Sequence, residues 1–238
     1  MFLPNLKLDS KDLPEKVIVC GDPDRAKLIA ANLDDAKLLG QNREYHTYVG
    51  HYQGEYIGVV SHGVGSPGAA VCFEQLIQGG VKELIRVGTA GSYQKEIEPG
   101  SLVISTAAVR QDGLSSQIVP EGFPAVADIT LTNRLIEKSR DYSIASYSGI
   151  TLTLDVFYQG AIVFPHNQYQ AAGVLAVEME IASLFTIASI RGIRAAAIVA
   201  IDGYADADLA EEYDPHTDQM KRAIELEKEI ALEAIAMK

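Results

Sequence analysis

Short runs of apolar, largely β-branched residues alternate along this chain with longer segments whose apolar positions recur every three or four residues. The short runs predict strands, and several of them lack polar positions, as strands covered on both faces do. The longer segments predict amphipathic helices. The predicted strands are 17–20, 57–61, 84–87, 102–105, 150–154 and 195–201, and the predicted helices are 24–33, 67–78, 131–140, 180–191 and 218–237.

Strands that alternate with helices indicate an α/β fold with a mainly parallel sheet. Ligands of such sheets bind beyond the carboxyl ends of the strands, so residues that directly follow a predicted strand are the first candidates for a site. The sequence contains no repeat and no linker rich in Pro, Gly or Ser, and its 238 residues are expected to form one domain, 1–238.

Composition narrows the class of protein. Hydrophobic residues make up 47% of the chain and charged residues 22%, as in globular proteins, and the net charge of −12 argues against a nucleic-acid partner. We find no signal peptide and no apolar run long enough to span a membrane, so a cytoplasmic protein without a membrane partner is expected. Cys20 and Cys72 stand in apolar runs and are expected to be buried free thiols. The histidines are scattered without zinc spacing, and no metal site is predicted.

The last predicted helix carries several glutamates among alanines and isoleucines. This pattern predicts a solvated face opposite a core face, and we assign these side chains no function. The glutamates are Glu225, Glu227, Glu229 and Glu233.

Two arginines follow predicted strands in settings that suit an anion. Gly21 directly follows the first strand, and Arg25 lies one helical turn further on, although this motif alone favours a simple strand-to-helix turn with a surface arginine. Arg86 stands at the end of a buried strand, where an unpaired charge is costly. With the hydroxyl of Thr89 nearby, Arg86 predicts an oxyanion site; the alternative is a structural ion pair with Glu83 or another acid.

Gly63, Gly65 and Gly68 match the G-x-G-x-x-G pattern of dinucleotide-binding loops. That pattern requires an acidic residue about 20 positions later, at the end of the next strand, and Arg86 lies there instead. A dinucleotide-dependent oxidoreductase is therefore a weak alternative. His62, next to this loop, is expected to be a structural histidine.

Acidic side chains form the remaining candidates. Glu178 and Glu180 flank Met179 where a helix is predicted to open. A carboxylate suits a pair of neighbouring sugar hydroxyls, and acids that complement the dipole at a helix start explain the pair equally well. Residues two apart on a helix diverge, so one of the two glutamates is expected to point elsewhere. Asp202 closes a long apolar strand and is a candidate general acid or a turn aspartate.

In this order, the motifs resemble the trimeric and hexameric nucleoside phosphorylase family, which includes purine nucleoside phosphorylases of bacterial and malarial type and uridine phosphorylases. The resemblance extends from Gly21 to the last helix, and the malarial type is the most similar. It implies a single-domain, three-layer α/β/α fold around a mixed, partly barrel-like sheet. The matching motifs are Gly-Asp-Pro-x-Arg (21–25), His-Gly-x-Gly (62–65), Arg-x-Gly-Thr-x-Gly (86–91), Phe-Pro-Ala-Val-Ala-Asp (123–128), Phe-Tyr (157–158) and Glu-Met-Glu (178–180).

The resemblance implies a role for each matching residue. A phosphate site is formed by Gly21, Arg25, Arg86 and Thr89, with Arg43 contributed by a neighbouring subunit. A nucleoside site is formed by Asn5, Val64, Phe157, Glu178, Met179, Glu180 and Asp202. Within it, Glu180 binds the 2′ and 3′ hydroxyls, Phe157 lies against the base, and Asp202 protonates or hydrogen-bonds a purine at N7.

The implied reaction is cleavage of the N-glycosidic bond of a nucleoside by inorganic phosphate, with no cofactor and with Arg86 and Asp202 as the catalytic residues. Shared sites imply a homo-oligomer, a hexamer built as a trimer of dimers. Purine is favoured over uridine because the stretch after Tyr158 lacks the Gln-x-Arg pair of uridine enzymes. The runs 89–91 and 108–113 look uridine-like and keep uridine phosphorylase as the alternative.

The sequence departs from the family pattern at two places. Asn5 replaces a histidine that reaches the 5′-hydroxyl in a neighbouring subunit, and no arginine follows Asp202 as it does in bacterial purine enzymes. The stretch 203–214 is acidic instead and is interpreted as a lid. These departures motivate a second alternative, a non-catalytic nucleoside-binding member of the family.

Overall fold

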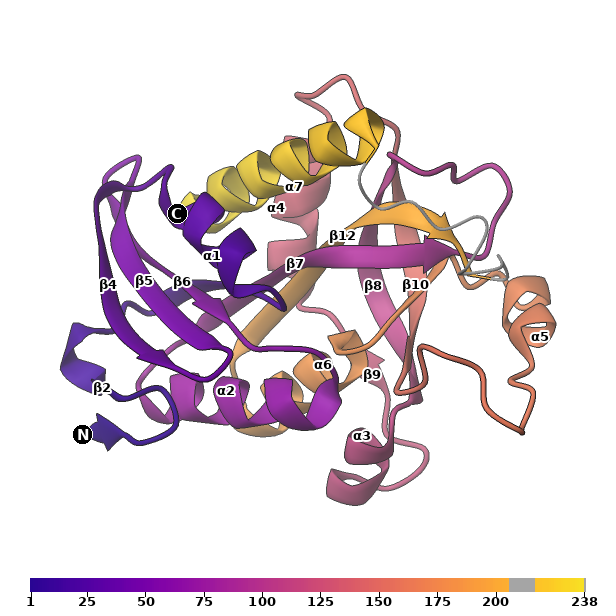
Figure 1. Ribbon diagram of the computed structural model, residues 1–238, viewed down its shortest axis with the longest axis horizontal. Coiled ribbons are helices and arrows are strands. Elements are labelled where there is room, and N and C mark those ends of the chain that lie inside the picture. Colours follow the sequence, from indigo (N-terminus) through magenta and orange to yellow (C-terminus); the bar gives the residue numbers. More distant parts are fainter. Residues whose placement is uncertain (206–216, 238) are drawn as a thin grey trace.

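The computed structural model describes residues 1–205 and 217–237 of the chain. Its centre is a ten-stranded mixed sheet, and a separate two-stranded sheet lies at the N-terminus (Figure 1). The small sheet pairs β1 (Phe2–Leu3) with β2 (Leu8–Asp9). The large sheet contains β3 (Lys16–Cys20), β4 (Asp34–Asn42), β5 (Tyr45–Tyr52), β6 (Glu55–Ser61), β7 (Glu83–Ser92), β8 (Leu102–Gln111), β9 (Ala125–Val126), β10 (Ser146–Leu154), β11 (Ala176–Glu178) and β12 (Arg194–Tyr204).

Part of the large sheet closes on itself. Its strand order is β11-β10-β8-β12-β7-β3-β6-β5-β4, and β11 also pairs with β7, so that the first five strands of this order form a barrel. The strands β6, β3, β7 and β12 lie next to one another and run parallel. Their carboxyl ends therefore meet at one edge, where the polar motifs of the sequence follow them.

Helices cover both faces of the sheet. The helices α2 and α6 pack on each other on one face, while α4 and α7 pack together on the other, where α1 covers β5 and β6 (Figure 1). The predicted three-layer α/β/α fold with a partly barrel-like sheet is confirmed. The helices are η1 (Ser10–Asp12), α1 (Pro23–Ala30), α2 (Ser66–Gln78), α3 (Gly113–Ile118), α4 (Ile129–Ser139), α5 (His166–Ala171), α6 (Ile181–Arg191) and α7 (Asp218–Ala236).

The apolar strands serve two cores at once. In β3, Val17 and Val19 belong to the core beneath α2 and α6, whereas Ile18 and Cys20 belong to the core beneath α1, α4 and α7. This alternation follows from the two-residue period of a strand and explains why the run contains no polar position. Cys20 and Cys72 are both buried and free, as expected.

The hairpin β4–β5 was absent from the sequence prediction. β4 is an edge strand whose side chains are mostly exposed, so its polar sequence lacks the apolar signal of the central strands. At the turn of this hairpin Arg43 has a φ of 53°, a left-handed conformation that non-glycine residues rarely adopt. Within the described part of the chain, no helix is long and apolar enough to cross a membrane.

Candidate active site

A cavity of about 1660 Å³ opens where the strands β3, β7 and β12 end, and the loop 155–165 between β10 and α5 borders it. Most residues predicted for the two sites line this cavity, whereas Asn5 and Arg43 do not. The lining residues among them are Gly21, Arg25, Val64, Arg86, Thr89, Phe157, Glu178, Met179, Glu180 and Asp202.

Arg86 lies at the floor of this cavity and is only 4% exposed. Its Nη2 donates to Oε2 of Glu180 and lies 3.3 Å from Oε2 of Glu178. Its Nε and Nη1 have no hydrogen-bond partner among the described residues. Arg86 thus combines the two alternatives drawn from the sequence, an ion pair and an anion site. One guanidinium nitrogen is in a buried ion pair, and the other two remain for an anion.

Gly88 makes room for this guanidinium. A Cβ atom at position 88 would lie 2.5 Å from Nη1 of Arg86, a distance that real Cβ atoms essentially never show. The backbone N–H of Gly88 donates to Glu227 at 2.7 Å, which fixes the strand end beside the guanidinium. The glycine of the Arg-x-Gly motif therefore has a steric function in the site.

The expectation that Glu178 and Glu180 diverge is wrong, because both carboxylates contact Arg86. Glu178 is the last residue of β11, and Glu180 precedes α6 with a φ of −144°, so neither glutamate has helical geometry. The helix begins at Ile181, one residue later than predicted. Glu178 accepts hydrogen bonds from the backbone N–H groups of Glu180 and Ile181 and from the hydroxyl of Thr153.

The two carboxylates differ in their electrostatic setting. Burial raises the pKa of Glu178 to about 7, against the opposing charge of Arg86. Burial acts on Glu180 in the same direction, but Arg86, His62 and the N–H of Gly65 outweigh it and lower its pKa below the ordinary value. Glu180 is therefore a carboxylate at neutral pH, fixed between a guanidinium and a backbone donor.

The glycine-rich loop 63–68 does not present an empty anion site. Gly63 and Gly65 have φ values of 77° and 91°, which favour glycine, and α2 begins directly after them. The N–H of Gly65 donates to Oε1 of Glu180 at 2.5 Å. A carboxylate of the chain itself therefore lies where a dinucleotide-binding loop would hold a pyrophosphate, which argues against the oxidoreductase alternative.

Of the remaining predicted phosphate residues, Gly21, Arg25 and Thr89 line the cavity together with Arg86, whereas Arg43 does not. The N–H of Gly63 donates to the carbonyl of Gly21 at 2.9 Å, so the loops after β3 and β6 are joined beside the cavity. Arg25 and Thr89 line the same region. Arg25 makes no ion pair and no hydrogen bond with any residue that the structure describes, so its guanidinium is available to a ligand.

Asp202 lines the cavity from an irregular position in β12. The pairing of β12 with β7 shifts register between Ile201 and Gly203, which is the position of Asp202. Such bulges re-aim side chains at the rims of barrels. The Asp202 side chain is largely buried and lines the cavity, as does the half-exposed ring of Phe157 on the facing loop.

Sequence reasoning missed the aromatic wall of the cavity. Phe164 and Tyr169 stack with ring centroids 5.3 Å apart, and the hydroxyl of Tyr93 lies 2.8 Å from Nδ1 of His166. Phe164, His166 and Tyr169 all line the cavity. These residues belong to a loop and a one-turn helix without apolar periodicity, so only the fold brings them to the site.

The arginine of the uridine-like run 108–113 does not line the cavity. Arg110 donates to Ser115 through Nε and to the carbonyls of Pro120 and Phe123 through Nη1, and so it holds the segment after α3. Its neighbour Gln111 lines the cavity.

The interpretation of Glu227 as a solvated residue is wrong. It is 1% exposed, whereas Glu225 on the same helix is exposed. Position 227 lies four residues after the buried Ala223 and three before the buried Ile230, which places it on the core face of α7. This helical spacing was the available signal, and the density of glutamates in the segment obscured it.

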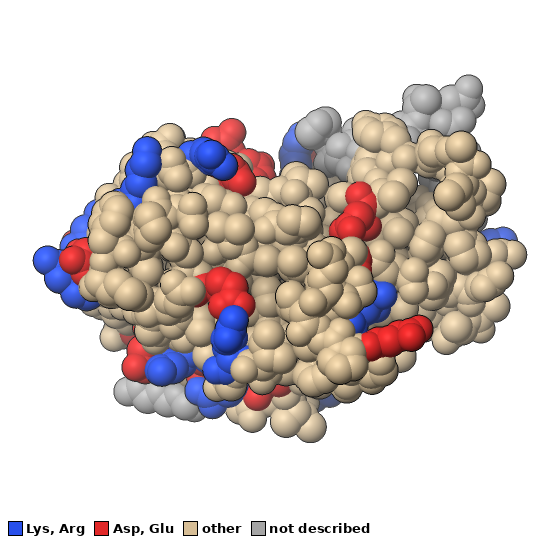
Figure 2. Space-filling model, turned by 90° about the horizontal axis from the view of Figure 1, so that it is seen from below, with Lys and Arg blue, Asp and Glu red and all other residues tan. Residues whose placement is uncertain are grey.

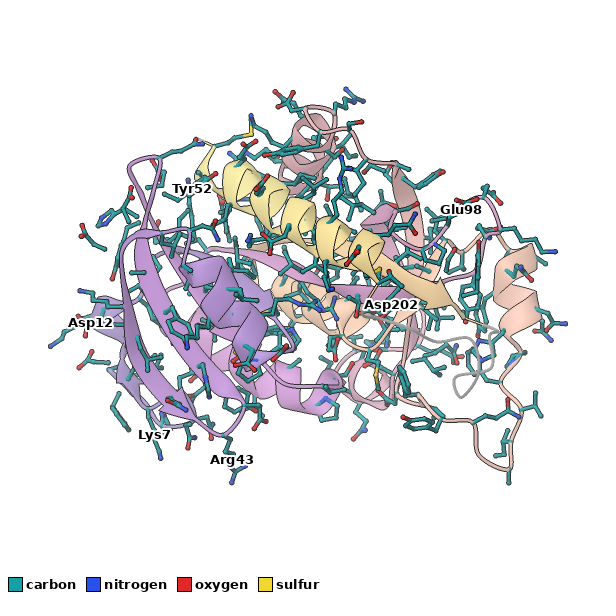
Figure 3. All side chains as sticks on the ribbon, turned by 45° about the horizontal axis from the view of Figure 1, so that its top comes forward. Lys7, Asp12, Arg43, Tyr52, Glu98 and Asp202 are labelled. Atoms are coloured by element: carbon teal, nitrogen blue, oxygen red, sulfur yellow. The ribbon has the colours of Figure 1, made fainter. Side chains whose placement is uncertain are left out.

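Arg43 and Asn5 lie together outside the cavity of their own chain. Both residues are exposed, and the side chain of Asn42 next to Arg43 donates to the carbonyl of Asn5 at 2.8 Å. In Figure 3, Arg43 extends away from the body at the hairpin end, far from Asp202. The acidic stretch interpreted as a lid falls mostly on 206–214, outside the described residues.

The face of the molecule shown in Figure 2 does not favour a nucleic-acid partner. On the face in Figure 2, Lys and Arg side chains stand beside Asp and Glu, and wide areas are uncharged. Among the described residues, no cluster of His, Cys, Asp and Glu has the geometry to hold a metal ion.

Comparison with known proteins places this geometry in a family. The model of the phosphorylase superfamily matches residues 15–236. The chain belongs to the phosphorylase superfamily. Purine nucleoside phosphorylase of Plasmodium falciparum is 37% identical over 204 residues, which are 85% of this chain and 83% of that protein. Uridine phosphorylase of Haemophilus influenzae is 36% identical over 197 residues, which are 77% of this chain and 78% of that protein.

A solved structure extends the match to nearly every residue. The crystal structure of purine nucleoside phosphorylase from Toxoplasma gondii in complex with immucillin-H superposes with a TM-score of 0.95 at 33% identity, and the match covers 99% of this chain and 96% of that one. Within the superfamily, the chain belongs to the nucleoside phosphorylases. Its relatives at similar identity include both a purine nucleoside phosphorylase and a uridine phosphorylase.

Proposed function

We propose that the protein is a purine nucleoside phosphorylase, which cleaves the N-glycosidic bond of a purine ribonucleoside or deoxyribonucleoside with phosphate. The observation that carries this proposal is the pair of unpartnered nitrogens, Nε and Nη1, on the buried Arg86, at the floor of a cavity that Asp202 also lines. A buried donor without a partner is costly, and a phosphate oxygen satisfies it with a charge-assisted hydrogen bond.

Phosphate binds among Arg86, Arg25, Thr89 and the backbone at Gly21. Two guanidiniums hold it as the C1′–N bond lengthens and the sugar acquires oxocarbenium character. The bound dianion stabilises that charge and attacks C1′, so catalysis is positioning together with electrostatic stabilisation. Phosphate is the co-substrate, and no further cofactor takes part in the proposed reaction.

Glu180 binds the sugar beside this phosphate. Its two oxygens already accept from Gly65 and Arg86, and each carboxylate oxygen retains a further lone pair for the 2′ or 3′ hydroxyl. Because these protein contacts fix the carboxylate before substrate arrives, little conformational entropy is lost on binding. Met179 and Val64 bound the sugar from the neighbouring segments, and Glu178 holds the start of α6.

Asp202 acts on the base. It hydrogen-bonds or protonates a purine at N7, which makes the base a better leaving group. Phe157 lies against the base plane. The structural engagement of Arg110 supports purine, since it removes the charged group of the uridine-like run from the cavity.

The active unit is a homo-oligomer, proposed as a hexamer built from a trimer of dimers. Arg43 is an exposed arginine without an ion pair in the described chain, on the same surface as Asn5, and it reaches the phosphate site of the partner subunit. Sedimentation with activity measurement tests this: a fully active monomer would contradict a shared site. The buried free thiols support a reducing, cytoplasmic location.

A substrate panel tests the proposed function. Inosine, guanosine, adenosine and uridine are incubated with and without phosphate, and free base is measured. We expect phosphate-dependent release of a purine base with little release of uracil. Much faster cleavage of uridine would establish the uridine alternative, and binding of inosine without turnover in excess phosphate would establish the non-catalytic one.

A further inference from the structure

At the proposed phosphate site, the buried carboxylates of the chain outnumber its guanidiniums. Glu178, Glu180 and Glu227 are each at most 4% exposed, and the pKa of Arg86 responds to all three. The cations are Arg86 and Arg25. Even with Arg43 of the partner subunit, a phosphate dianion brings two negative charges into a region whose charges at best cancel. Buried charge of one sign is costly, so the site needs another positive charge.

A proton on one of the three carboxylates would supply that charge. Two of the three are poorly placed to bind it. Glu178 accepts from the hydroxyl of Thr153 and two backbone N–H groups and forms an ion pair with Arg86, so a proton there must compete with several donors. Glu180 is held by the N–H of Gly65 and by Arg86. Glu180 is thus held in its ionised form, whereas at Glu178 burial outweighs the donors and raises the pKa to about 7. At alkaline pH both glutamates are ionised.

Glu227 has the fewest donors of the three. It accepts one hydrogen bond, from the N–H of Gly88 at 2.7 Å, and forms no ion pair with a described residue. The charged and titratable groups that face it are Arg25 from α1, Arg86 from β7 and Cys20 from β3. Its neighbour on α7, Lys228, is bonded instead to Glu225.

The electrostatics of Glu227 agree with this geometry. Burial raises its pKa to about 8, and the charge of Arg25, the N–H of Gly88 and the charge of Arg86 oppose that rise. A bound phosphate draws on the same two guanidiniums that favour the carboxylate form. It therefore raises the pKa of Glu227 further, and the carboxyl holds a proton across a wider pH range.

We propose that Glu227 is a positioning residue of the phosphate site that takes up one proton from solvent when a phosphate dianion binds to Arg25 and Arg86. The inference rests on the proposed function. The proton is bound to a carboxyl oxygen of Glu227, no covalent bond of phosphate changes, and the carboxyl still accepts from Gly88. At alkaline pH, phosphate affinity thus depends on proton activity through a group that does not touch phosphate.

Calorimetry tests this on the full chain with inorganic phosphate alone. Titrations at about pH 9, in two buffers that differ in ionisation enthalpy, give the number of protons taken up per phosphate; phosphate itself is a dianion throughout. The wild type is expected to take up more than half a proton. E227Q, whose amide oxygen still accepts from Gly88, is expected to take up none. E225Q, a change of the same kind on an exposed position of α7, is expected to match the wild type.

Kinetics supply a second readout. Above about pH 8, the KM for phosphate of the wild type is expected to rise toward tenfold per pH unit, as one linked proton requires, whereas that of E227Q stays nearly flat. Equal proton uptake by wild type and E227Q would overturn the inference and leave the proposed function intact. Absence of phosphate binding by the wild type would instead refute the proposed function.

Discussion

The two ends of the cavity are built by different means. At the end proposed to bind phosphate, charged groups stand on the ends of central strands and on helices behind them, and Arg86 and Glu227 are almost fully buried. At the end proposed to bind the base, the loop 155–165 contributes half-exposed or exposed apolar side chains, with Phe157 47% exposed and Ile162 87% exposed. The first end is fixed by the sheet, and the second by a loop on its rim.

If the proposed function holds, this difference separates the groups that carry out the chemical step from those that select the base. Groups on a packed sheet need no reorganisation when charge develops, so they are suited to the step that every substrate shares. A loop can change its sequence at little cost to the fold. Solved structures of a purine nucleoside phosphorylase and of a uridine phosphorylase both share this fold, so selectivity between the two bases does not require a different sheet.

Replacement of Arg86 should produce the largest effect and thereby test the phosphate end. Arg86→Lys retains the charge that Glu178 and Glu180 require but loses the planar fork of donors. We expect kcat/KM to fall by about a thousandfold, from the loss of preorganised donors. Phosphorolysis of inosine measures it, and Arg191→Lys, on an exposed ion pair, is the matched control. A loss below tenfold would remove the fork of Arg86 from the mechanism.

Asp202→Asn tests the one polar group assigned to the base. An asparagine can still hydrogen-bond but cannot protonate N7, so purine cleavage should slow by about a hundredfold. The KM for phosphate should change little, because the contacts of Arg86 remain. Asp141→Asn, an exposed change of the same kind, serves as the control. Undiminished inosine cleavage by Asp202→Asn would exclude a catalytic role for this carboxyl.

Gly88→Ala tests whether the strand end is fixed as tightly as the fold suggests. The new Cβ would meet Nη1 of Arg86 at 2.5 Å, so the guanidinium must move by close to 1 Å. We expect kcat/KM for phosphate to fall by about 10- to 100-fold, since small misplacements of catalytic groups are costly. Gly122→Ala, where an added Cβ meets open space, should behave as wild type. An unchanged Gly88→Ala enzyme would mean that the guanidinium adapts freely.

The contrast between buried central strands and the peripheral strands and loops also explains which features the sequence could predict. The central strands and their terminal motifs were found because a strand buried on both faces has an unbroken apolar run, and a glycine or arginine directly after it stands out. Strand β4 was missed because an edge strand is polar. Glu227 was misassigned because its burial depends on the helix face it occupies. The pair Tyr93 and His166 is adjacent only in the fold.

The base end should respond weakly to single changes. Phe157→Ala removes an aromatic face from the proposed base site, and an aromatic contact contributes about 0.5–1.5 kcal/mol, so the nucleoside KM should rise about three- to tenfold. The KM for phosphate should stay constant. Phe2→Ala, an exposed aromatic position outside the cavity, provides the comparison. A loss as large as that of Arg86→Lys would contradict the division between the two ends.

The charges of the phosphate end should also affect stability in the absence of ligand. Because burial raises the pKa of Glu227 to about 8, the folded state holds a proton that the unfolded state releases above its ordinary pKa of 4.5. The free energy of unfolding contributed by this group therefore falls as pH rises from about 5 to 8 and then levels off.

Glu227→Gln removes that titration. As pH rises from about 5 to 8, the Tm of the variant relative to that of the wild type should therefore increase, by a few degrees for a chain of this size. Thermal unfolding at several pH values without phosphate measures the gain, with Glu225→Gln as control. Parallel Tm curves for wild type and Glu227→Gln would mean that the carboxyl is ionised at little cost in the folded state. A diverging curve would mean that the chain retains a destabilising acid beneath its anion site, as expected if that acid serves the bound ligand and not the fold.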